Sequence, residues 1–170
     1  MSLSATISAQ IAATLAGAPD LGTPTFDMRP ASSVLAQLTS GVGVGQADKI
    51  FAHAGRVLAA SASESFTLDA ALTDPLGAAL TFVTVKAILI RAAVGNTNDV
   101  VVGGAAANAF VGPFGAAANS IAVPPGGAFL WCAPKTGKTV VPATGDILKI
   151  ANGGAGTSIA YDIVIIGTSA

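Results

Sequence analysis

The feature that most constrains the fold is a two-residue alternation of side chains along short segments bounded by glycine and proline. The clearest segment runs from Ser158 to Ile166. Its two faces carry Ile159, Tyr161, Ile163 and Ile165 on one side and Ala160, Asp162, Val164 and Ile166 on the other. Successive side chains of a strand point to opposite faces, so this period predicts strands rather than helices.

The segment Thr81 to Ala93 is apolar on both faces of the strand that it predicts. Alternation assigns one face to Phe82, Ile88 and Ile90 and the other to Val83, Val85 and Leu89. A strand that is apolar on both faces lies in the middle of a sheet or under a partner. We therefore expect this segment to be the core strand.

Shorter alternating segments surround these two. They are Ser33–Leu38, Ile50–His53, Ser65–Asp69, Val100–Val102, Asn119–Val123, Ala128–Cys132 and Asp146–Ala151. Turn-forming residues separate them, as in Asp74–Gly77 and Pro124–Gly127. Many short strands at near-regular spacing predict an all-β fold, an antiparallel β-sandwich or jelly roll, over residues 46–170.

Residues 1–45 have a different pattern. Ile7, Ile11 and Leu15 are four residues apart, which suits one face of a helix or every second inward position of a strand. Ser, Thr and Gln fill the opposite face of the strand, and this favours the strand. Gly41, Gly43 and Gly45 predict a flexible joint. We expect an extended N-terminal arm or a pair of lead-in strands.

Composition argues against several classes of protein. The chain of 170 residues is 52% hydrophobic and 10% charged, with a formal net charge of −1, whereas about 25% charged residues is typical. Lys86 and Arg91 interrupt the longest apolar run, no secretion signal is recognisable, and no basic cluster exists, so neither membrane nor nucleic acid is an expected partner. A lone Cys132 predicts no internal disulfide.

No motif predicts an enzyme, a cofactor or a metal site. Pro134–Thr139 resembles the end of a phosphate-binding loop, but Cys132 stands where the first glycine is needed and no helix is expected to follow. The Gly41–Gly45 segment lacks the third glycine of a dinucleotide fingerprint. His53 is the sole histidine. A sandwich enzyme using His53 or paired aspartates remains an alternative.

Several segments together point to a family. They are Leu72–Gly77, Leu80–Ile88, Pro124–Gly127 before an aromatic strand, Ala133–Gly137, Gly145–Ile150 and Tyr161–Gly167. Over Ala47–Ala170 they resemble the small β-rich structural proteins encoded among the virion genes of tailed bacteriophages. The resemblance implies a decoration or cement protein that binds the outer capsid lattice and stabilises the head. A tail, neck or host-binding component of the virion is the alternative.

The resemblance implies two partners, the major capsid protein and further copies of the chain, as a homotrimer or a dimer. It implies a location on the capsid exterior, after assembly in the host cytoplasm. A low charge content suits a surface covered by such partners. For the contacts we expect Ile7, Ile11 and Leu15 of the arm, then Phe110, Phe114 and Trp131. Ordinary core packing is the alternative for all six.

Overall fold

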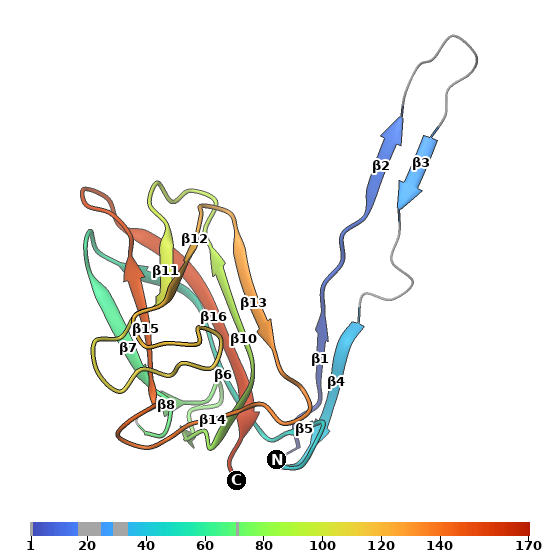
Figure 1. The fold of residues 1–170 in the computed structure, drawn as a ribbon, viewed down its shortest axis with the longest axis vertical. Coiled ribbons are helices and arrows are strands. Elements are labelled where there is room, and N and C mark those ends of the chain that lie inside the picture. The colour runs from blue at the N-terminus through green and yellow to red at the C-terminus, as the bar shows by residue number, and fades with distance from the viewer. Residues whose placement is uncertain (1, 17–24, 29–33, 71) are drawn as a thin grey trace.

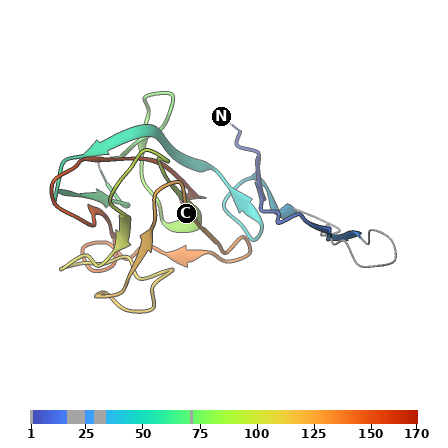
Figure 2. The same ribbon diagram turned by 90° about the horizontal axis from the view of Figure 1, so that it is seen from above.

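The computed structural model describes residues 2–16, 25–28, 34–70 and 72–170, and it contains no helix within them (Figure 1). The predicted all-β fold class is confirmed. The elements form a β-sandwich and, beside it, an N-terminal arm, which Figure 2 shows standing to one side of the sandwich.

Two antiparallel sheets make up the sandwich. The first, called here the β10 sheet, has the order β13-β10-β16-β6, and β14 pairs with the start of β10. Its strands are β6 (Lys49–Leu58), β10 (Thr84–Ala92), β13 (Ala128–Cys132), β14 (Lys138–Thr139) and β16 (Ile159–Thr168). The second, the β11 sheet, has the order β12-β11-β15-β7. Its strands are β7 (Ser63–Thr67), β11 (Val100–Gly103), β12 (Ser120–Val123) and β15 (Ile147–Asn152).

The chain passes from one sheet to the other at nearly every connection. From β6 to β16 the long strands alternate between the two sheets, except that β11 and β12 are neighbours in the same sheet. A small hairpin of β8 (Leu72–Thr73) and β9 (Ala79–Leu80) lies between β7 and β10.

The core fills the space between the two sheets. Ile159, Tyr161, Ile163 and Ile165 of β16 are at most 1% exposed, as the alternation predicted. They share one apolar cluster with residues of the facing sheet, among them Val100, Val102, Leu148 and Ile150.

The core strand is central, as expected, but the assignment of its faces was wrong at Val85. Val85 is fully buried in the same cluster as Ile88 and Ile90. A β-bulge explains this, because the register with β16 shifts between Val85 and Ala87 and leaves Lys86 as an extra residue. The extra residue reverses the facing of the strand residues on one side of the bulge, so Val85 points into the core, whereas Phe82 and Val83 precede the strand.

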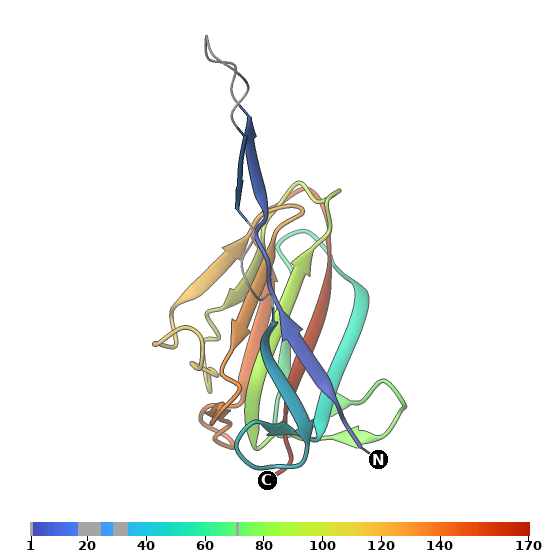
Figure 3. The same cartoon turned by 90° about the vertical axis from the view of Figure 1, so that its right-hand side faces the viewer.

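The arm consists of β1 (Ala5–Ser8), β2 (Ala13–Ala16), β3 (Thr25–Met28), β4 (Val34–Ser40) and β5 (Gln46–Ala47). β1 pairs antiparallel with β4, which pairs with β5, whereas β2 and β3 form a separate ribbon. Figures 1 and 3 show the β1–β4 pair beside the β10 sheet and the β2–β3 ribbon extending past the end of the sandwich. Both ends of the chain lie at the opposite end of the molecule.

Candidate interaction surface

The root of the arm packs on the outer face of the β10 sheet. Ile7 of β1 and Leu38 of β4 are 6% and 1% exposed. With Ala47, Ala87 and Ile166 they form an apolar cluster that is separate from the core of the sandwich. Burial of apolar surface therefore holds the root in place.

A polar link reinforces the root. The Lys135 carbonyl accepts a hydrogen bond from the Gly45 N–H at 3.3 Å and another from Lys86 Nζ at 2.6 Å. Lys86 is the bulged residue of β10 and is 3% exposed. Its burial lowers the pKa of the ammonium group. The turn between β4 and β5 is thereby tied to the central strand through the loop before β14.

The outer face of the β10 sheet carries two apolar rows of cross-strand neighbours. The covered row, beneath the arm, is Cys132, Ala87, Ile166 and Ile50. The open row, two residues further along β10, is Leu130, Leu89, Val164 and Ala52. Residues two apart on a strand share a face, so both rows face outward.

The open row is apolar and only partly covered by the arm, because Leu130 and Val164 pack against the root cluster. Leu89 is 37% exposed, and Leu130, Val164 and Ala52 are half-buried. A groove of about 300 Å³ runs between β1 and the two rows, lined by Ile7, Ala87, Leu89, Leu130, Val164 and Ile166 among others. Beyond the open row the surface becomes polar at an ion pair of Arg91 with Asp162, 2.8 Å long.

The arm also exposes apolar side chains of its own. Ile11 lies on residues 9–12, which link β1 to β2 outside either strand, and it is 73% exposed. Leu35 of β4 is 54% exposed on the strand face opposite Leu38. The arm therefore carries apolar side chains that the sandwich of the same chain does not bury.

The three arm residues singled out from the sequence are placed differently. Ile7 is buried in the root, and Ile11 is exposed on the linking segment. Leu15 lies in β2 opposite Phe26 of β3, and its side chain is outside the described part of the structure. The expected common face of Ile7 and Ile11 is absent because the strand is broken between them.

The three aromatic candidates lie at the core of the sandwich. Phe110 is 2% exposed and belongs to the cluster between the sheets. Phe114 and Trp131 are half-buried against this cluster, and Phe114 stacks on Phe129 with the ring centroids 6.3 Å apart. The structure does not bring these residues together with Ile7 or Ile11.

Sequence reasoning missed the open row. The segments around Leu89 and Val164 were recognised as strands, but Leu130, Leu89, Val164 and Ala52 come from four strands far apart in the chain. They become neighbours through the strand order and register, for which the sequence carries no local signal. Apolar residues on the second face of both central strands were the one available indication.

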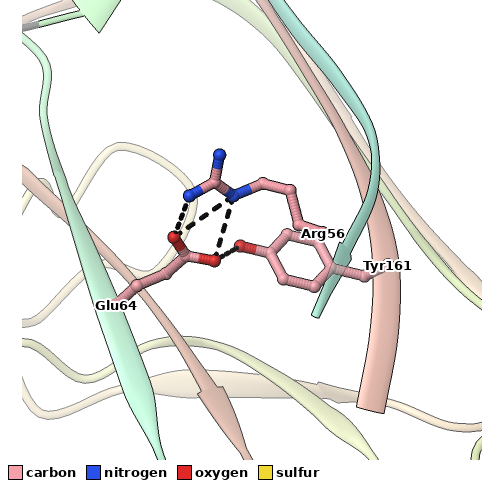
Figure 4. Close-up of polar contacts among 3 residues, drawn as sticks. All are labelled: Arg56, Glu64 and Tyr161. Carbon is pink, nitrogen blue, oxygen red and sulfur yellow. Dashed lines mark hydrogen bonds and ion pairs between the residues drawn. The ribbon is translucent and has the colours of Figure 1, made fainter. Parts of the chain in front are cut away.

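A polar cluster joins the two sheets at one edge of the sandwich (Figure 4). Glu64 of β7 accepts hydrogen bonds from Arg56 of β6, with Nε 3.1 and 3.2 Å from its two oxygens, and from the Tyr161 hydroxyl of β16. Burial raises the pKa of Glu64, but the bonds from Arg56 and Tyr161 outweigh it, and the net pKa is lowered. Burial and the Glu64 carboxylate raise the pKa of Tyr161. Each charge has its partner, so the cluster stabilises the edge.

The structure shows where His53, the Pro134–Thr139 segment and Cys132 lie. His53 is exposed on β6, with its ring 5.7 Å from that of Phe51, and makes no hydrogen bond to a Ser or Asp of the described residues. Pro134–Thr139 leads into β14, not into a helix. Cys132 is half-buried in the covered row, and burial raises the pKa of its thiol.

Neither a metal-binding cluster nor a membrane-spanning helix is present in the described ranges. No group of three or more His, Cys, Asp or Glu side chains in these ranges is placed to hold a metal ion. They also contain no helix of sufficient length and hydropathy for a bilayer crossing.

Comparison with known proteins gives no relative. No protein-family model matches the chain, and no curated protein and no solved structure matches it either.

Proposed function

We propose that this chain is a structural component of a bacteriophage virion, a decoration or cement protein. It self-associates, as a trimer or a dimer, and binds the major capsid protein on the outside of the head. On this proposal it acts at the capsid exterior, after assembly in the host cytoplasm, and its activity is mechanical.

The observation that carries the proposal is the arm. The β2–β3 ribbon extends past the sandwich and pairs with no other described strand (Figure 3). Each of its two strands therefore has an unpaired edge in the described part of the chain, and such an edge can add to a strand of another protein. A ribbon that pairs with no described strand of its own sandwich is readily explained as an element that contacts a partner.

The strand order also supports the proposal. We propose that the sandwich is a jelly roll, because a five-stranded and a four-stranded sheet face each other and the chain alternates between them at each connection except β11–β12 and β13–β14. Jelly rolls are common in viral capsid proteins, and also in lectins and other proteins. The fold is therefore compatible with a virion protein without requiring one.

Binding to the assembled lattice is the proposed mechanism of stabilisation. A protein that binds neighbouring capsid subunits only when they are assembled shifts the equilibrium toward the assembled shell by mass action. Several weak contacts from one oligomer add to the effect, because each contact after the first is intramolecular. Internal DNA pressure is then opposed by the added interface.

Particles purified from cells that produce the chain test the proposal. We expect electron microscopy to show density for the chain across the head lattice, and quantitative mass spectrometry to give a copy number in fixed ratio to the capsid protein. Density confined to the tail or neck would replace this function with the host-binding or neck alternative. Absence from every particle would overturn the virion function altogether.

A variant that lacks the ribbon tests its role in binding. Deleting residues 13–28 removes β2 and β3 but keeps the β1 and β4 strands that pack on the sandwich. We expect this variant to fold and to lose binding to heads that lack the protein, whereas the full chain added to the same heads rebinds. Equal binding of both chains would exclude the ribbon as the capsid contact.

A further inference from the structure

We propose that the open row is a docking site for the arm of a second copy of this chain, with Ile11 of that arm seated against Leu89 and Val164. The contact is head to tail, because the arm of one copy binds the sheet of the next. The inference rests on the proposed function, in which copies of the chain associate, and it names the surface through which they do so.

The covered and open rows are both apolar, but the arm covers more of the first than of the second. Ala87 and Ile166 of the covered row are 4% and 9% exposed because β1 and β4 lie over them. Leu89, the next outward residue of β10, is 37% exposed. An antiparallel sheet with one solvated face alternates apolar and polar residues, so an apolar row here indicates surface that a partner covers.

The groove makes the two rows one continuous surface. Its lining includes Ile7 of the arm, Ala87 and Ile166 of the covered row, and Leu89 of the open row. A second hollow continues from Leu89 and Val164 to Ala52 and the Arg91–Asp162 pair. The new site therefore extends an interface already occupied by an arm, and an extended apolar segment of the same kind fits it.

The arm supplies the matching element. Ile11 follows Ile7 by four residues, roughly 13 Å of extended chain, and lies on the segment that links β1 of the root to β2 of the ribbon. It is 73% exposed, and it lines neither the groove nor the hollow of its own chain. Ile11 and Leu89 are thus both exposed in one chain, and contact between copies buries both.

A head-to-tail contact has a defined consequence for assembly. The arm and the open row are different surfaces, so each copy can give one contact and receive another. Such an interface closes into a ring when the rotation between copies divides a full turn, and a trimer is the smallest ring beyond a dimer. Arg91 and Asp162 bound the row on its polar side and limit how far the docked segment extends.

The experiment measures the mass of the purified chain in solution over a range of concentrations, by sedimentation or light scattering. We expect the unaltered chain to associate. Leu89→Glu and Ile11→Glu should each weaken association roughly tenfold or more, because a charge is placed in an apolar contact. Leu76→Glu is the matched control, because Leu76 is 75% exposed on the β8–β9 turn, and it should associate like the unaltered chain.

Mixing the two variants identifies the geometry. The Leu89→Glu chain keeps an intact arm, and the Ile11→Glu chain keeps an intact open row, so an equimolar mixture should form heterodimers that neither variant forms alone. A symmetrical contact of two open rows would not be restored by mixing. Thermal unfolding of each variant must match that of Leu76→Glu, which separates lost association from lost folding.

Three results would overturn the docking site. They are a chain that stays monomeric at all concentrations, association that Ile11→Glu leaves unchanged, and a mixture that fails to associate although each variant is folded. These measurements contain no particle, so they are independent of the capsid-binding test. A chain that forms rings but is absent from virions would keep the docking site and lose the virion function.

Discussion

Glu64 illustrates how a single side chain can connect two sheets. It lies on β7 of the β11 sheet, and its partners Arg56 and Tyr161 lie on β6 and β16 of the β10 sheet. The Glu64 and Arg56 side chains are 20% and 29% exposed, so water screens their ion pair only partly. The guanidinium also lies 5.1 Å from the centroid of the Phe66 ring.

We predict that Glu64→Gln lowers the free energy of unfolding at pH 7 by about 1–3 kcal/mol, because Arg56 then loses its charged partner. Arg91→Gln is the comparison. It breaks the pair with Asp162, in which the Arg91 side chain is 69% exposed, and should cost less than about 1 kcal/mol. Urea unfolding measures both, and equal losses would contradict a stabilising role for the buried pair.

The same carboxylate predicts a dependence of stability on pH. The pKa of Glu64 is lower in the folded protein than in the unfolded chain, where about 4.3 is usual. Its contribution is therefore fully present well above pH 4.3 and is lost as the pH falls through the folded pKa. We expect the stability difference between the unaltered chain and Glu64→Gln to shrink over this acid range. A difference that is constant with pH would contradict this assignment.

At this scale the sequence predicted which strand residues of β16 face inward, because parity along one strand is a local property. It did not predict the Glu64 cluster. Arg56, Glu64 and Tyr161 are spread over more than a hundred residues, and an arginine, a glutamate and a tyrosine are unremarkable one by one. Only the packing of the two sheets brings them together.

Among the elements, β10 and its bulge determine the layout of one end of the sandwich. Lys86 is the extra residue, and beside it Val85 pairs with Gly167 of β16. A Cβ at Gly167 would lie 2.1 Å from the Thr84 carbonyl oxygen and 2.7 Å from Phe82 Cδ1. The close approach of the two strands here therefore requires glycine.

We predict that Gly167→Ala destabilises the fold by about 1–3 kcal/mol or more, because the backbone of β10 or β16 must move to admit the methyl group. Gly95→Ala is the matched control. A Cβ at Gly95 would have no atom within 4 Å, and we expect its unfolding temperature to stay close to that of the unaltered chain. A Gly167→Ala protein as stable as the control would show that the strands can separate without cost.

The strands themselves could be predicted because alternation and turn residues are local signals. The segment predicted at Ile50–His53 is longer in the structure, where β6 runs from Lys49 to Leu58. Its second half includes Gly55, with a φ of 63°, and Val57, which is 65% exposed, so the apolar–polar alternation is interrupted there. The bulge in β10 could not be predicted, because nothing in the sequence distinguishes an inserted residue from a paired one.

In the whole molecule, the arm root and the sandwich core are two separate apolar clusters. Loosening one should therefore leave the other intact. The root depends on few large side chains, chiefly Ile7, Leu38 and Ile166, whereas the core of the sandwich contains many. The arm is accordingly the part expected to open first.

We predict that Leu38→Ala weakens docking of the root by about 2–5 kcal/mol, since Leu38 is 1% exposed. Amide hydrogen exchange should become faster in β1 and β4, while β10 and β16 stay protected. Leu35→Ala removes a 54% exposed side chain from the same strand and is expected to change neither. Faster exchange throughout the sandwich would show that the two clusters unfold as one.

At this largest scale the sequence predicted an arm before residue 45 and a sandwich after it, from a change of pattern between the two parts. It did not predict that β1 and β4 pack on the sandwich while β2 and β3 leave it. That division depends on contacts between residues such as Ile7 and Ile166, which are separated by almost the whole chain. Such contacts follow from the three-dimensional arrangement of the sheets.

The position of the chain ends has a practical consequence. Both ends lie at the end of the molecule opposite the β2–β3 ribbon (Figure 1), and Ser169 is held there by hydrogen bonds of its N–H and hydroxyl to the two oxygens of Asp48, at 2.8 and 2.5 Å. A peptide or enzyme fused after Ala170 would thus be displayed at the end of the molecule opposite the β2–β3 ribbon.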